Sequence, residues 1–169
     1  FYQPGVQVCV QEVATRECAG EVFEAGNKRR RVLVVDAVML TPDQDSGSLR
    51  MVNLLELFLD LGWHVSFVPS NLEFQGHYGR QLQQRGVEVF SSPQVQSIGK
   101  LLEERGRTFD VVVLSRADVA GPLLESVRLH APDASVWYDT VDLHFLREQR
   151  EAELRNDPAA RERALRRKV

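Results

Sequence analysis

The chain has 169 residues, of which 43% are hydrophobic and 27% are charged, an ordinary balance for a soluble domain with a sizeable core. A formal net charge of −3 gives no reason to expect a nucleic-acid partner, and no apolar run approaches the roughly 20 residues that cross a bilayer. Cys9 and Cys18, the two cysteines, match no common metal or redox spacing, so we expect free thiols in a reducing compartment.

Residues 1–27 differ from the rest of the chain. Val6, Val8 and Val10 alternate as in a short strand, but no helix pattern follows them. After a polar junction, the uninterrupted β-branched run at 31–36 is typical of a strand buried on both faces of a parallel sheet. We therefore expect residues 1–27 to be an N-terminal extension, compatible with the end of an upstream domain.

From residue 31 onward, short β-branched runs alternate with apolar positions at helical spacing, and a glycine follows three of the helical stretches. The predicted strands are 31–36, 65–68, 87–90, 110–114 and 135–138, and the predicted helices are 49–61, 78–85, 95–105 and 119–130. This order predicts an α/β fold, a Rossmann-like doubly wound and mainly parallel sheet with helices on both faces, over residues 28–148. The runs at 32–35 and 111–114 should be its central strands.

Residues 149–169 are expected to form a charged helical linker that leads on from the predicted domain. The helical pattern begins near residue 146 and is interrupted at 156–158. Residues 145–169 contain eight Lys/Arg and five Asp/Glu, so this segment carries +3 and the remainder −6. Such a segment is usually a solvated helix face, and it leaves open a peripheral association with a membrane surface.

Two polar loops follow the first and the last predicted strand, at 41–48 and 138–144. Because the carboxyl ends of parallel strands meet at one edge of a sheet, we expect 45–48 and 139–144 to lie side by side and to line one open cleft. Gly47 would let a ligand approach the backbone closely at the start of the next helix, where N–H groups point at negative charge. Capping of that helix by Asp45 or Ser46 is the structural alternative.

The loop after the first strand argues against several nucleotide-binding families. Its single glycine, Gly47, does not make a G-x-G-x-x-G dinucleotide motif, and no lysine follows it as in a P-loop. Asp36 ends the strand as in a phospho-receiver domain, but Ala37 stands where a second acidic residue is needed, and 89–91 supplies no aspartate. The G-x-S-x-G motif of α/β hydrolases is also missing from the sequence.

Five stretches carry a family resemblance: 34–51, 61–65, 85–89, 109–116 and 138–148. The most specific motifs are Pro-Asp-Gln-Asp-Ser-Gly-Ser at 42–48 and Tyr-Asp-Thr-Val-Asp-Leu-His at 138–144. Through them, residues 31–151 resemble the N-terminal half of bacterial GT-B glycosyltransferases of the group 1 (family 4) kind. Residues 1–20 more faintly resemble the end of a family 2 glycosyltransferase domain, although Val10 and Gln11 stand where that family has histidines.

The resemblance implies an enzyme fragment, the acceptor-side half of a GT-B fold. Such a transferase moves a sugar from a nucleotide-sugar to a glycan or lipid-linked acceptor in cell-surface polysaccharide biosynthesis, in the cytoplasm or at the inner face of the cytoplasmic membrane. The donor would bind mainly through the missing C-terminal domain, so the isolated chain should be inactive. The resemblance implies no metal and no other cofactor. The alternative is a non-catalytic Rossmann-like binding or scaffold module of a multidomain surface-glycan biosynthesis protein.

The predicted site residues come from the two polar loops and from the end of the fourth strand. Carboxylates can hydrogen-bond sugar hydroxyls and assist deprotonation of an acceptor, so Asp139 and Asp142 are the predicted catalytic residues. The predicted substrate-binding residues are Asp45, Ser46, Gly47, Ser48, Arg50, Arg116 and His144. Three structural alternatives stay open: a cap formed by Asp142, a surface position for Arg50, and an ion pair of Arg116 with Asp118 or Asp139.

Overall fold

The computed structural model describes residues 29–141 and 150–166, and it contains one five-stranded sheet. The strands are β1 (Arg31–Asp36), β2 (His64–Pro69), β3 (Glu88–Val89), β4 (Val111–Ser115) and β5 (Ser135–Asp139). Their order is β3-β2-β1-β4-β5, and every neighbouring pair is parallel. The predicted fold class is therefore confirmed, and β1 and β4 are interior strands.

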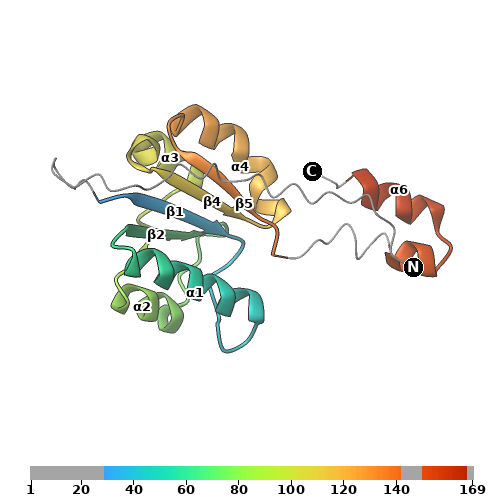
Figure 1. Cartoon of the computed structure of the whole chain (residues 1–169), viewed down its shortest axis with the longest axis horizontal. Helices are drawn as coiled ribbons and strands as arrows, with labels where there is room; N and C mark the ends of the chain where they lie inside the picture. Colours follow the sequence, from blue (N-terminus) through green and yellow to red (C-terminus); the bar gives the residue numbers. More distant parts are fainter. Residues whose placement is uncertain (1–28, 142–149, 167–169) are drawn as a thin grey trace, which may run out of the picture.

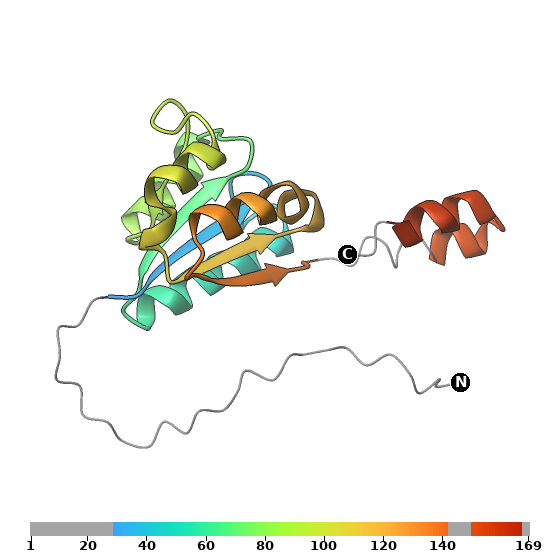
Figure 2. The same cartoon turned by 90° about the horizontal axis from the view of Figure 1, so that it is seen from above.

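Helices cover both faces of the sheet (Figures 1 and 2). The helices between strands are α1 (Ser46–Asp60), α2 (Gly76–Gln84), α3 (Ile98–Arg105) and α4 (Ala117–His130), with the 3-10 turn η1 (Gly106–Thr108) after α3. α1 and α2 pack on one face, and α3 and α4 pack on the other. Crossovers between parallel strands are right-handed, so the helices change face when the chain returns past β1 to add β4.

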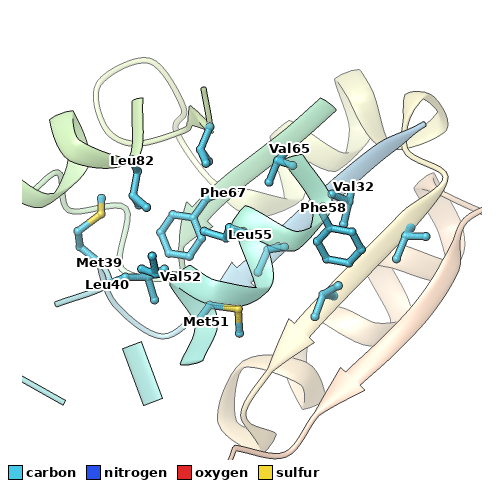
Figure 3. Packing of buried hydrophobic residues seen from close by; sticks show 14 residues of the cluster. Val32, Met39, Leu40, Met51, Val52, Leu55, Phe58, Val65, Phe67 and Leu82 are labelled. Carbon is cyan, nitrogen blue, oxygen red and sulfur yellow. The ribbon is translucent and has the colours of Figure 1, made fainter. Parts of the chain in front are cut away.

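The side chains of β1 explain its uninterrupted apolar sequence. Val32 and Val34 belong to the hydrophobic cluster under α1 and α2, whereas Leu33 and Val35 belong to the cluster under α3 and α4. All four side chains have no exposed surface. Figure 3 shows the α1 side of this arrangement, where α1 side chains pack over Val32 and neighbouring β2. A strand between two helical layers must be apolar at every position.

Two segments show how polar side chains set the ends of helices. α3 begins at Ile98, later than the predicted residue 95, because the Ser97 side chain accepts the backbone N–H of Lys100 at 3.1 Å and caps the helix. The predicted interruption at 156–158 is present, since residues 150–154 are helical and α6 (Pro158–Arg166) is a separate helix. Asp157 caps α6 by accepting the N–H of Ala160 at 2.9 Å.

The winding direction reverses between β1 and β4, which makes their carboxyl ends the topological switch point of the sheet. The first residues after this point are Ala37, which leads to α1, and Arg116, which leads to α4. The N-terminal extension, the 142–149 segment with Asp142 and His144, and residues 167–169 lie outside the described residues. Within the described ranges, no helix has the length and apolar character needed to cross a membrane.

Candidate functional site at the carboxyl edge

Three polar residues, Asp36, Ser115 and Asp139, end β1, β4 and β5 on the same face of the sheet. Ser115 pairs with Asp139, and Asp36 continues the register in which Val35 pairs with Leu114. Alternate residues of a strand point to the same face, and Val34 and Val113 pack under α1, so the residues two positions later also point to the α1 side. The topology thus gathers these residues beside the start of α1.

Asp45 caps α1 and accepts three hydrogen bonds from the protein. Its Oδ1 accepts the Ser48 backbone N–H at 2.8 Å, and its Oδ2 accepts the hydroxyls of Ser48 at 2.5 Å and Thr41 at 3.1 Å. The hydrogen bond from the Ser48 hydroxyl is the main reason why the pKa of Asp45 lies below its usual value. The structural alternative for Asp45 is therefore realised, and Ser46 is the first residue of the helix rather than its cap.

We expect Asp45→Ala to lower the free energy of unfolding at pH 7 by about 1 kcal/mol, the usual cost of losing an N-cap. Because folding lowers the Asp45 pKa, its charge stabilises the protein above the unfolded pKa near 3.8, and this contribution is lost as pH falls through the lower folded pKa. Urea unfolding at pH 7 measures the loss in Asp45→Ala. The pH dependence is tested with Asp45→Asn, which removes the charge, from pH 7 to pH 3. The difference in free energy of unfolding between wild type and Asp45→Asn should shrink at the acid end, and a constant difference would contradict the prediction.

An ion pair between Arg50, in α1, and Asp139 connects the segments that contain the two predicted loops. Arg50 Nη2 donates to Asp139 Oδ2, and a Cβ added to Gly47 would lie 3.3 Å from Val141 Cγ1 and 3.5 Å from Arg116 Nη2. The start of α1 and the segment after β5 therefore lie side by side. The open cleft that these loops should line stays a prediction, because it also depends on residues 142–144.

Arg116 is bound to a partner that the sequence did not suggest. Its Nε donates to Asp36 Oδ1 at 2.8 Å, and the Asp36 side chain is only 2% exposed. The predicted alternatives, an ion pair with Asp118 or Asp139, are wrong, because Arg116 reaches Asp139 only through a backbone hydrogen bond, from its N–H to the Asp139 carbonyl, at 2.8 Å. β1 lies next to β4, and this neighbour relation brings Asp36 within reach of Arg116.

Two residues beside Gly47 have backbone conformations that favour glycine. Arg116 has φ 72° and ψ 145°, and Val141 has φ 48°. Residues held in such regions cost on the order of 1–3 kcal/mol each, and the surrounding contacts must compensate for that cost. Here the ion pair to Asp36 and the backbone bond to Asp139 hold Arg116 in place. Strain of this kind concentrates at functional sites, which supports a functional reading of this edge.

Sequence reasoning missed Asp36 and Ser115 as members of the site. The signal for Asp36 is a carboxylate at the end of a buried apolar strand, a feature that the sequence alone associates with phospho-receiver domains. Ser115 gave no signal of its own. In the structure its hydroxyl is buried and has no hydrogen-bond partner among the described residues.

The described residues contain no group of three or more His, Cys, Asp or Glu side chains arranged to hold a metal ion. Comparisons with protein-family models, with curated proteins and with solved structures find no match for this chain.

Proposed function

We propose that this chain is the acceptor-side domain of a glycosyltransferase that moves a sugar from a nucleotide-sugar to a glycan or lipid-linked acceptor in cell-surface polysaccharide biosynthesis. The supporting observation is the contact between the two stretches that resemble the family, made by Arg50 of α1 and Asp139 at the end of β5, next to the topological switch point. Ligands of open α/β sheets bind at such points, because loops and helix N-termini converge there. The proposal places the protein in the cytoplasm, with the inner membrane face as an open alternative.

The residues at this edge have the chemical groups that sugar transfer requires. Asp139 is the proposed catalytic carboxylate, together with Asp142 of the same loop, and either could accept the proton of an acceptor hydroxyl. Arg116 and the N-terminus of α1 would stabilise the negative charge of a leaving diphosphate. Arg50 orients Asp139, and the absence of a side chain at Gly47 leaves room for the ligand beside Arg116.

The second candidate is a non-catalytic Rossmann-like binding or scaffold module. One observation favours it: Asp139 is paired with Arg50 and Asp36 with Arg116, which are also the contacts of a purely structural ion-pair network. A module of this kind would keep the fold and its ion pairs but would not bind a nucleotide-sugar at this edge. The two candidates are therefore distinguished by whether a nucleotide-sugar binds at the residues of this edge.

The test is NMR titration of the isotope-labelled chain with a panel of nucleotide-sugars, followed by a transfer assay on the same sample. We expect weak binding with shifts at Ser46, Gly47, Arg116 and Asp139, and no turnover, because the donor should bind mainly through a second domain. Shifts at none of these residues with any donor would favour the non-catalytic module. Tight binding or measurable transfer by these 169 residues would contradict the two-domain interpretation.

A further inference from the structure

The outer edge of β5 has backbone groups that no described strand pairs with. β5 is the last strand of the sheet beyond β4, and the Ser135 N–H donates to the Asp110 carbonyl at 2.9 Å on the β4 side. Backbone groups of successive strand residues point to opposite sides of the strand, so Trp137 also bonds towards β4. The N–H and C=O groups of Val136 and Tyr138 therefore point outward, away from β4.

The side chains of β5 are also exposed at this edge, on both faces of the sheet. Trp137 and Tyr138 are 47% and 44% exposed. The Trp137 ring lies on the α1 face, with its centroid 5.9 Å from that of Phe58, whereas Val136 packs on the α3 and α4 face. A strand edge with free backbone groups and exposed apolar side chains is a template for pairing with another strand.

The opposite edge of the sheet lacks these properties. β3 has only two residues, and its Glu88 carboxylate is held by Arg105 at 3.0 Å. Short and charged edges of this kind do not recruit further strands. β5 has five residues and one charged side chain, Asp139, whose charge is paired with Arg50 of the same molecule. Neither shortness nor an unpaired charge therefore protects the β5 edge.

The free groups of β5 are arranged symmetrically about Trp137. If a second copy of β5 runs antiparallel to the first, Val136 lies opposite Tyr138 of the other copy, and each such pair exchanges two N–H···O bonds. Trp137 then lies opposite its own equivalent on the two-fold axis. Asp139 lies opposite Ser135, so no two carboxylates face each other across the contact. The edge is thus complementary to itself in both hydrogen bonds and charge.

We infer that the free edge of β5 is a self-association surface, through which two copies of this chain join their sheets in an antiparallel β5–β5 contact with Trp137 on the two-fold axis. Such a contact closes with two copies, because the same surface serves both partners. A five-residue edge is small beside specific interfaces, which bury about 1,200 Å² or more, so the dimer forms in a concentration-dependent way. The inference does not rest on the proposed function.

Sedimentation equilibrium of the whole chain over a range of concentrations tests the dimer. Wild type should sediment between monomer and dimer, and a monomer at every concentration would overturn the inference. Tyr138→Pro removes an outward N–H without removing a bond to β4, so it should raise the dissociation constant about tenfold or more. Trp137→Lys should do the same and serves if the proline variant does not fold. Unchanged association in the folded variants would also overturn the inference.

Leu154→Lys is the matched control for the loss of an exposed apolar side chain. Leu154 is 86% exposed and lies outside the sheet, so its replacement should leave the dissociation constant unchanged. Weaker association in this variant, equal to that in Trp137→Lys, would show that general hydrophobicity rather than the β5 edge drives association, and would overturn the inference.

Disulfide trapping tests the register, in a background where Cys9 and Cys18 are replaced by serine. The two copies of residue 137 should have Cα atoms about 4.5 Å apart, within the range that a disulfide spans, so Trp137→Cys should form a covalent dimer on mild oxidation. The two copies of residue 135 should lie about 13 Å apart, so Ser135→Cys should not. Equal cross-linking of both variants would overturn the antiparallel register.

Hydrogen exchange separates a second copy from other occupants of the edge. In the dimer, the N–H groups of Val136 and Tyr138 should be protected and should lose this protection on dilution, whereas the Trp137 N–H should stay protected because it bonds to β4. Protection of Val136 and Tyr138 in a sample that sediments as a monomer would show that the chain covers its own edge, and would overturn the inference.

Discussion

Arg116→Ala is expected to lower the free energy of unfolding by about 3 kcal/mol, and Arg116→Gly is expected to lower it by about 1 kcal/mol less. Both variants leave the buried Asp36 carboxylate without its ionic partner, which is the larger cost. Only glycine removes the strain of φ 72° at this position. Urea unfolding at pH 7 measures both values.

The order of the two variants is the informative result. At an ordinary position, glycine is less stable than alanine, because it loses more conformational freedom on folding. If Arg116→Gly is more stable than Arg116→Ala, the difference reports backbone strain at residue 116. If Arg116→Ala is as stable as Arg116→Gly or more stable, the strain is contradicted. Adding Asp36→Asn to Arg116→Ala should recover part of the loss, since it removes the unpaired buried charge.

Gly106→Ala is expected to destabilise the protein by about 1–3 kcal/mol, the usual cost of overpacking a close contact. Gly106 joins α3 to η1 and packs against the end of α4. A Cβ at this residue would lie 2.6 Å from the His130 carbonyl oxygen and 2.8 Å from its carbonyl carbon. These are backbone atoms, so the alanine variant fits only if one helix end moves. Thermal and urea unfolding would measure the loss.

Gly99→Ala, in the neighbouring helix α3, provides the control. Among the described residues, a Cβ there would meet only the Ser97 hydroxyl at 3.9 Å, an ordinary contact. This substitution should be neutral or should stabilise by up to about 1 kcal/mol, because alanine favours a helix more than glycine does. A Gly106→Ala protein as stable as Gly99→Ala would show that η1 and α4 are not tightly packed.

The sequence by itself determined the layered α/β fold. The uninterrupted apolar run at 31–36 predicted a strand covered on both faces, and β1 is such a strand, with its side chains divided between two hydrophobic clusters. Glycines after three helical stretches marked the alternation of helices and strands. Hydrophobic periodicity and the glycines that end helices are local properties of the sequence. They can therefore be recognised without knowing which elements become neighbours. The same local signals predicted that the loops at 45–48 and 139–144 share one edge, and of these the structure describes 45–48 and 139–141, which lie side by side.

Only the tertiary structure decided which side chains meet at that edge. Asp36 and Arg116 are 80 positions apart in the sequence, and their ion pair exists because β1 and β4 are adjacent and place both residues near the start of α1. The backbone conformation of Arg116 is likewise held by Asp36 and by the carbonyl of Asp139, a residue of a third segment. The burial of the Ser115 hydroxyl, which has no partner among the described residues, likewise depends on the interior position of β4 in the sheet. Such contacts depend on strand order and pleat, which no short stretch of sequence specifies.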